Sequence, residues 1–391
     1  MDIDSLSYGF HRAGFSLLLV VFLDAYCAGG RGGEYRVYWG DVHTHTNLSD
    51  GKGTPDQLVT YARDVAHLDF VVLSDHDFGN GPPWRMPPQA WNQIQDKVDK
   101  YTVAGKFVAI AGYEWTSQGK YWTQVGPNQP SEQLFPGPPK LYNHKNVYFP
   151  ARVEQIFSAK DAAYQTPDLL AEAVRRRGGL IQNNHPCSFG DSETRDQWEY
   201  TPEHSPVIVN TEMGPDTNRY QGKTYQLNWE QSVRAFLSTG RTTGFVGGSD
   251  THEGKPAART AVLAEALTRE ALFAALRSRR NYAVTHARIV LDFRINGHRM
   301  GEEIVTQEKP QIAVSVTGTA PIAELAIIRD GSVLHRLAPG VPQIQFTYRD
   351  DSFRQSSYYY LRVIQSDADE EGNPSQAWSS PIWVKQSATL P

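Results

Sequence analysis

Short apolar runs alternate with segments of helical periodicity over the first two thirds of the chain, from about residue 35 to residue 286. The runs at residues 69–73, 107–111 and 243–246 have the length and the Val, Ile and Phe content of buried strands. The segments with apolar residues at helical spacing predict helices near residues 54–65, 89–101, 167–177 and 231–238. Repeated strands and helices predict an α/β domain with a parallel sheet, most simply a barrel.

After about residue 287 the pattern changes to short β-type runs separated by turn signals. Asn296-Gly297 and Asp330-Gly331 are dipeptides favoured in two-residue hairpin turns, because both central residues of such a turn need a positive φ. The runs cover residues 290–295, 311–316, 323–328, 343–347 and 358–363. About a hundred residues of this kind predict a small antiparallel β-sandwich, which we place at residues 287–386.

The first thirty residues contain an apolar run at positions 14–23, followed by the small residues Ala28, Gly29 and Gly30. A helix that spans a bilayer needs about 20 apolar residues, whereas this run has the length found in signal peptides. We therefore expect a signal peptide at residues 1–30, export to the periplasm or the extracellular space, and no stable membrane span.

The net charge and the cysteine content exclude some classes of binding partner and of fold. The 391 residues carry a formal net charge of -5, which argues against a nucleic-acid binder, since such proteins normally have a basic excess. The two cysteines, Cys27 and Cys187, make no disulfide framework once the leader is set aside. We expect the partner to be a small molecule.

Polar residues with metal-binding side chains follow almost every predicted strand. His43 and His45 are two residues apart, so their side chains fall on one face of an extended segment, and Asp250 and His252 repeat this spacing. In a parallel α/β barrel the strand ends meet at one face, where active sites form. The residues expected to converge there are His43, His45, Asp50, His76, Glu114, His185, Asp250 and His252, with His144 as a ninth member.

Each of these residues alone has an ordinary explanation. A histidine before a proline, such as His185, often ends a turn, and Glu114 could be a surface carboxylate. Eight coincidences at the ends of successive strands favour a metal site instead. Lys145 and Arg259 lie near these residues in sequence and are candidates to hold an anionic group.

The ordered set resembles the PHP (polymerase and histidinol phosphatase) metallohydrolases over residues 35–286. The matching stretches are His43-Thr44-His45-Thr46, Ser49-Asp50-Gly51, Ser74-Asp75-His76-Asp77, Glu114, Asn184-His185-Pro186 and Asp250-Thr251-His252. The resemblance implies a distorted (β/α)7 barrel with up to three metals, held by the nine residues above, with Glu114 bridging. The tail at residues 377–384 resembles secreted PHP proteins with an appended β-domain, including hydrolases of carbamates and other esters.

Mixed imidazole and carboxylate ligands suit zinc, manganese or iron, and such cations lower the pKa of bound water enough to supply hydroxide at neutral pH. Two or three metals can bind two oxygens of a tetrahedral phosphoryl centre. We therefore expect a metal-dependent phosphoesterase in which Asp250, Glu114 and His252 act in catalysis. The alternatives are a carbamate or carboxylic-ester hydrolase of the same fold, and a non-catalytic binding module.

Overall fold

The computed structural model describes residues 35–78, 85–117, 142–186 and 197–387, all within one compact unit. The expected signal peptide, both cysteines and the segment at residues 118–141 lie outside the described residues. Export of the chain therefore stays a prediction.

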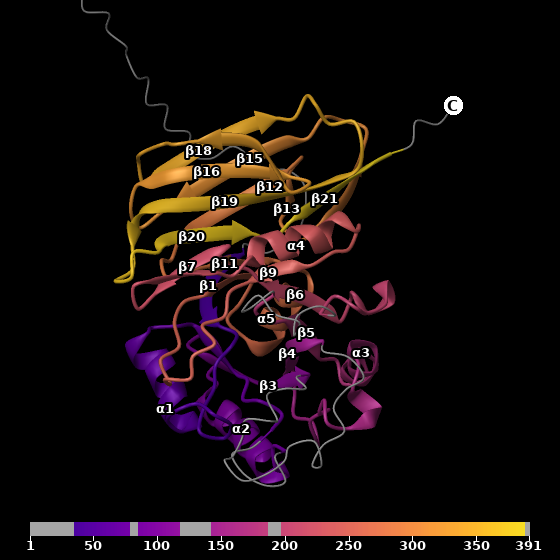
Figure 1. The fold of residues 1–391 in the computed structure, drawn as a ribbon, viewed down its shortest axis with the longest axis vertical. Coiled ribbons are helices and arrows are strands. Elements are labelled where there is room, and N and C mark those ends of the chain that lie inside the picture. Colours follow the sequence, from indigo (N-terminus) through magenta and orange to yellow (C-terminus); the bar gives the residue numbers. More distant parts are fainter. Residues whose placement is uncertain (1–34, 79–84, 118–141, 187–196, 388–391) are drawn as a thin grey trace, which may run out of the picture. The chain divides into compact units, whose positions relative to one another are not determined.

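The first part of the chain contributes a run of neighbouring strands. Their bounds are β1 Arg36–Asp41, β2 Phe70–Leu73, β3 Val108–Ser117, β4 Asn143–Phe149, β5 Leu180–Asn183, β6 Ile208–Glu212, β9 Gly244–Val246 and β10 Thr260–Ala264. They lie side by side in the order β10-β1-β2-β3-β4-β5-β6-β9. Figure 1 labels β1, β3, β4, β5, β6 and β9 of this run. A hairpin of β7 Thr217–Tyr220 and β8 Lys223–Gln226 is inserted after β6. The strands predicted at residues 69–73, 107–111 and 243–246 are confirmed.

The sheet is mixed, so the prediction of a parallel sheet is wrong in part. The pairs β1–β2 and β2–β3 are parallel, as are β5–β6 and β6–β9. In contrast, β4 is antiparallel to both of its neighbours, and β10 is antiparallel to β1. A parallel pair needs a crossover connection, usually a helix, and the sequence between β3 and β4 has no helical periodicity. The reversal brings the first residues of β4 beside the last residues of β3.

The predicted helices are confirmed with small shifts of their ends. Their bounds are α1 Pro55–Thr60, α2 Pro88–Tyr101, α3 Pro167–Arg175 and α4 Trp229–Ser238, and a further helix, α5 Arg269–Arg277, precedes the last strands. The side chain of Thr54 accepts from the Gln57 N–H, while the Gln57 side chain accepts from the Thr54 N–H. This reciprocal capping satisfies two backbone donors and makes the start of α1 definite.

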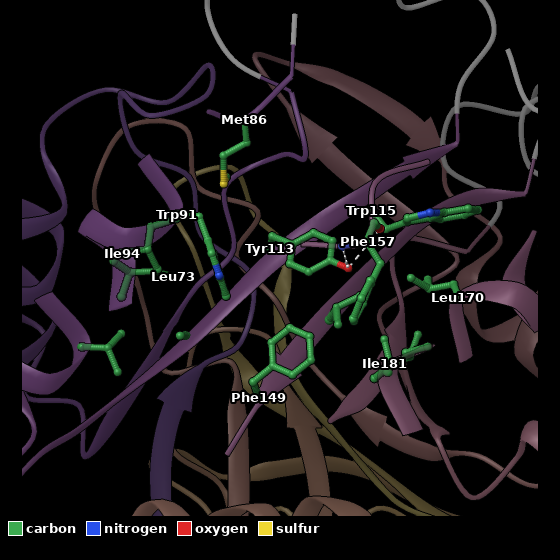
Figure 2. Packing of buried hydrophobic residues seen from close by; sticks show 14 of the residues in the cluster. Leu73, Met86, Trp91, Ile94, Tyr113, Trp115, Phe149, Phe157, Leu170 and Ile181 are labelled. Carbon is green, nitrogen blue, oxygen red and sulfur yellow. Dashed lines mark hydrogen bonds between the residues drawn. The ribbon is translucent and has the colours of Figure 1, made fainter. Parts of the chain in front are cut away.

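One apolar cluster fills the space between the sheet and its outer helices (Figure 2). The Trp91 ring of α2 meets Tyr113 of β3 edge to face, with ring centroids 5.9 Å apart, and Phe149 of β4 at 6.1 Å. The buried Tyr113 hydroxyl donates to the Phe157 carbonyl (3.1 Å) and accepts from the Phe157 N–H (3.0 Å). These two hydrogen bonds offset the cost of removing the hydroxyl group from water, so the tyrosine can be fully buried in β3.

The opposite face of the same strands closes on a second apolar cluster. Its members include Phe70, Val108, Tyr148, Val246 and Val262, which come from β2, β3, β4, β9 and β10. Side chains from strands far apart in the order can meet only if the sheet curves around them. The strand run is therefore strongly curved.

The last part of the chain is built from strands. Their bounds are β11 Asn281–Val284, β12 Val290–Ile295, β13 His298–Arg299, β14 Glu303–Thr306, β15 Gln311–Thr317, β16 Ile322–Arg329, β17 Ser332–Leu337, β18 Gln343–Arg349, β19 Ser357–Ala368, β20 Pro374–Ser379 and β21 Ile382–Gln386. One sheet has the order β13-β12-β15-β18, and β16, β17, β19, β20, β21 and β14 belong to the large sheet. Phe293 and Val314 of the first sheet share a buried cluster with Leu325 and Leu361 of the second, as in a sandwich. The expected antiparallel pairing holds except between β14 and β21, which are parallel.

The large sheet continues across the boundary expected near residue 287. β11 pairs with β10 on one side and with β20 on the other, both antiparallel. Beside this junction Glu230 of α4 is buried and accepts from the Tyr360 hydroxyl at 2.6 Å and from the Trp378 indole at 3.2 Å. Arg362 forms an ion pair with the same carboxylate. The two parts of the chain are therefore joined by backbone hydrogen bonds and by a buried charge.

Candidate metal centre

Imidazole and carboxylate side chains gather at one edge of the curved sheet. His76 follows β2, Glu114 lies in β3, and the two are joined by an isolated β-bridge. Because β4 runs antiparallel to β3, His144 at its start pairs with Thr116 near the end of β3. The structure brings together every residue predicted for the site: His43, His45, Asp50, His76, Glu114, His144, His185, Asp250 and His252.

Two histidines and two carboxylates surround the first position. His43 Nε2 lies 3.2 Å from Glu114 Oε1 and 3.3 Å from Asp250 Oδ1. His45 Nε2 lies 3.5 Å from Glu114 Oε2 and 3.0 Å from Asp250 Oδ1. The two Nε2 atoms are themselves 3.2 Å apart. The His-x-His spacing thus aims both rings at one point, as the alternation of an extended segment requires.

Asp50 stands at the centre of a second group, on the outer side. His252 Nε2 lies 3.3 Å from Asp50 Oδ1, and His76 Nε2 lies 3.5 Å from Asp50 Oδ2. His45 Nδ1 is 3.7 Å from Asp50 Oδ1, so the ring of His45 faces both groups. The His45 and His252 rings stack with centroids 4.2 Å apart.

Glu114 is the most connected residue of the site. Its Oε2 lies 2.8 Å from His76 Nδ1, and its Oε1 lies 3.0 Å from His144 Nδ1 and 3.4 Å from His185 Nε2. Asn184 Nδ2 donates to Oε1 at 2.7 Å. With both oxygens facing imidazoles, this carboxylate has the geometry expected of a ligand shared between two cations.

The donor atoms fit divalent cations. His45 Nδ1 and His144 Nε2 are buried and make no hydrogen bond within the part of the chain that the structure describes. Buried polar atoms are normally hydrogen-bonded, so two such atoms in one site indicate a missing partner. Within the described residues, the side chains form four overlapping groups. In each group, the ligand atoms lie within 4.8 Å of one another. Nitrogen and oxygen donors without cysteine suit zinc, manganese or iron.

Glu212, at the end of β6, supports the site from behind. Its Oε1 accepts from His43 Nδ1 at 2.7 Å and from Gln182 Nε2 at 3.1 Å, and its Oε2 accepts from the His185 N–H at 2.5 Å. The first bond fixes the tautomer of His43 so that its Nε2 presents a lone pair to the centre. The sequence-based site did not include Glu212, although, like His76 after β2, it lies at the carboxyl end of a strand.

Two further buried aspartates hold the loops that carry the ligands. Asp75 accepts four hydrogen bonds from Thr46 and Ser49, which follow the His-x-His pair. Asp41, the last residue of β1, accepts from the N–H groups of Ser249 (3.0 Å) and Ala257 (2.9 Å). The loop after β9 is thereby tied to the end of β1.

Backbone conformation at the site is unusual. His185 and Asp250 have positive φ angles of 23° and 49°, a backbone conformation that residues other than glycine rarely adopt. A Cβ on Gly248 would lie 2.2 Å from Glu212 Oε1 and 2.5 Å from His43 Cβ. Strained residues and a close backbone approach are typical of sites whose geometry is imposed by the surrounding structure.

The close packing of charges sets the protonation of the site. Burial lowers the pKa of His76, but the carboxylates of Glu114 and Asp50 outweigh it and raise this pKa to about 10. For His144 burial dominates, and its pKa falls to about 4. The imidazoles oppose the effect of burial on Glu114 and hold its pKa well below the usual range. Protons and divalent cations compete for the same lone pairs here, so metal binding should release protons.

The two basic residues considered for anion binding take other positions. Lys145 alternates with His144 along β4 and points away from the centre: its Nζ donates to Asn183 Oδ1 at 2.7 Å and to the Gln197 carbonyl at 3.0 Å. Burial lowers the pKa of Lys145 to about 7. Arg259 is half-buried, and its charge interacts chiefly with Asp41.

No family model matches the chain. Its sequence is similar to that of an uncharacterized protein of Chlamydia trachomatis serovar D, at 27% identity over 378 residues, and of an uncharacterized protein of Chlamydia muridarum, at 26% over 378 residues. Each match covers 88% of this chain and 57% of the relative, so the chain spans little more than half the length of these relatives.

Among solved structures, the chain is similar to a two-domain protein from Bacteroides vulgatus that contains a predicted PHP-like metal-dependent phosphoesterase. The TM-score is 0.46 at 14% identity, and the match covers 89% of this chain and 99% of that protein. Within the described residues, the helices are all too short or too polar to cross a membrane.

Proposed function

We propose that this chain is a metal-dependent hydrolase of small phosphate esters. The observation that carries the proposal is the convergence of nine buried or half-buried imidazole and carboxylate side chains, Glu114 among them, at one edge of the sheet. A purely structural metal site needs about four closed ligands, whereas this set has donors for two to three cations. Zinc, manganese and iron are the metals that the donor set favours.

The ligands divide into a rigid inner set and an accessible outer pair. His43 and Glu114 are at most 1% exposed, while the side chains of Asp250 and His252 are 41% and 38% exposed. We assign substrate contact and proton transfer to Asp250 and His252, because only exposed groups can reach a bound ester. Glu114 is assigned as the shared ligand that positions the cations.

The cations, when bound, lower the pKa of a water molecule and neutralise charge that develops on the substrate oxygens. The chain's own residues orient this chemistry. Glu212 holds the ring of His43, and the Asp250 carbonyl accepts from His252 Nδ1 at 3.0 Å, which leaves His252 Nε2 directed at Asp50. A tetrahedral phosphoryl group can engage several cations at once, whereas a planar carbonyl needs one, so a site of this size favours phosphate esters.

We further propose that the curved strand run is a distorted (β/α)7 barrel of the PHP type at residues 35–286, with a β-domain at residues 287–386. The shared apolar cluster inside the curve and the gathering of ligands at one edge support this assignment. Export, with a signal peptide at residues 1–30, belongs to the same proposal and rests on the sequence alone.

The test is a substrate panel with defined metals. The chain, loaded with zinc, manganese or iron, should hydrolyse an aryl phosphate; chelator should abolish turnover, and readdition of metal should restore it. His43→Ala and Asp250→Ala should lose the activity with an unchanged circular dichroism spectrum, while His298→Ala, on an exposed strand, should keep it. Turnover of carbamates or carboxylic esters without phosphate esters would support the alternative hydrolase, and metal binding without any turnover would support a binding module.

A further inference from the structure

A groove of about 530 Å³ lies at the opposite end of β1 from the metal centre. Tyr35 lines it just before β1 begins, whereas Asp41 ends β1 beside the site. Six strand residues at about 3.3 Å each separate the two ends by roughly 20 Å. The groove is therefore a separate surface feature.

Three arginines line this groove. Arg279 and Arg280 follow α5, and Arg299 lies in β13. The guanidinium carbons of Arg280 and Arg299 lie 4.8 Å and 5.3 Å from the centre of the Tyr35 ring, so both guanidinium groups lie over one aromatic side chain. Stacking on an aromatic ring restricts a guanidinium while leaving its N–H groups free to bind a ligand.

The carboxylates of the groove are largely occupied. Glu303 pairs with Lys385 at 2.7 Å and with Arg279 at 3.5 Å, and Glu302 pairs with His298 at 2.8 Å. Glu302 Oε1 also accepts from the Arg299 backbone N–H at 3.1 Å, and among the described residues neither carboxylate forms an ion pair with the guanidinium of Arg280 or Arg299.

Neither of the two arginines over Tyr35 has a close carboxylate partner among the described residues. Arg299 has an ion pair of 3.6 Å with Asp292, which is long for a charge-assisted hydrogen bond. For Arg280, no carboxylate lies within ion-pair distance among the described residues, and its Nε is buried without a hydrogen bond. Among the described residues, the positive charge of Arg280 is thus not compensated by a carboxylate in ion-pair contact.

We propose that this groove binds a phosphate group, held by Arg280 and Arg299 against Tyr35. Guanidinium groups match phosphate oxygens through paired N–H donors, and a tetrahedral anion can accept such pairs from two directions at once. A planar carboxylate has only two oxygens and would satisfy one of the two guanidiniums. The same chemistry is offered by a free phosphate ester and by the headgroup of an anionic phospholipid.

The test measures binding rather than turnover, so its outcome is independent of the proposed hydrolase activity. The full chain is treated with EDTA, checked for its fold by circular dichroism, and titrated with inorganic phosphate by calorimetry. Sedimentation with phosphatidylglycerol vesicles, and with phosphatidylcholine vesicles as the neutral reference, distinguishes a lipid headgroup from a free phosphate. Added salt should weaken either interaction, because it is electrostatic.

The double variant Arg280→Gln/Arg299→Gln should weaken binding of the effective probe by about tenfold or more, since two charge-assisted contacts are lost. Arg280→Lys/Arg299→Lys keeps the charge but not the paired donors. Its affinity for the probe should lie between that of the Gln double variant and that of the parent chain. The matched control Arg336→Gln/Arg349→Gln removes two exposed arginines elsewhere and should bind normally. If neither probe binds the parent chain, or if the first double variant binds as the parent does, the proposal is wrong.

Discussion

A single carboxylate outside the ligand set, Glu212, controls the orientation of a central ligand. It accepts from His43 Nδ1 and from the backbone N–H of His185, so two ligand-bearing segments depend on it. In Glu212→Gln an NH2 group replaces one oxygen of the carboxylate, so one buried hydrogen-bond acceptor is lost. Changes to such supporting groups typically lower metal affinity or activity by about 10–100-fold.

We expect Glu212→Gln to bind metal about 10–100-fold more weakly than the parent chain, with little change in its melting temperature. Competition with a metal-binding dye measures the affinity, and Glu308→Gln, on an exposed turn, serves as the control. Unchanged metal affinity in Glu212→Gln would show that the Glu212–His43 contact does not orient the ligand.

At the scale of elements, the loop after β9 must approach the ends of β1 and β6 closely. Gly248→Ala places a methyl group 2.2 Å from Glu212 Oε1 and 2.5 Å from His43 Cβ, which is impossible without movement of the loop. Because Asp250 and His252 are carried by the same loop, we expect a loss of metal binding larger than the loss of stability. Gly222→Ala, in the β7–β8 turn where no atom lies within 4 Å, should affect only stability.

Metal content after dialysis and the melting temperature, measured on both variants, separate these effects. Full metal content in Gly248→Ala would mean that the loop accommodates the methyl group without displacing its ligands.

At the scale of the whole molecule, Glu230 joins α4 to β19 and β20. Burial raises the pKa of Glu230, but Arg234, Arg362 and the hydrogen bonds from Tyr360 and Trp378 outweigh it, so the net shift is downward from 4.5. A carboxyl group with a depressed pKa stabilises the folded state above its unfolded pKa, and this contribution is lost as the pH falls through the folded pKa. Glu230→Gln should lower the free energy of unfolding by about 3 kcal/mol at neutral pH, the cost of breaking a buried ion pair.

The difference in stability between the parent chain and Glu230→Gln should be constant above about pH 5 and should shrink as the pH falls below about 4. Denaturant titrations across this range measure it. A difference that is independent of pH down to pH 3 would exclude ionisation of Glu230 as the cause.

The same junction predicts the effect of removing the C-terminal part. A chain that ends at residue 286 leaves β11 without its partner β20 and leaves Glu230 without its contacts to Tyr360 and Trp378. We expect this truncated chain to aggregate or to melt at a much lower temperature than the full chain, as judged by size-exclusion chromatography and thermal unfolding. A soluble, equally stable fragment would show that the part at residues 35–286 folds independently.

The sequence by itself determined most of the local structure and which residues gather in the candidate site. Apolar periodicity located the helices and strands, because burial of one face imposes the spacing of each element. The positions of His43 and Asp250 just after predicted strands were enough to expect convergence, since strand ends meet at one edge of a sheet. The turns at Asn296-Gly297 and Asp330-Gly331 have the expected positive φ angles, which few other residues adopt.

Only the tertiary structure decided what depends on long-range pairing. The reversal of β4, which brings His144 to Glu114, follows from strand neighbours that no local pattern specifies. The role of Glu212 behind His43 and the turning of Lys145 away from the centre depend on which face of a strand meets which partner. The continuation of the sheet through β11 and β20 had no sequence signal either, because backbone hydrogen bonds carry no side-chain pattern.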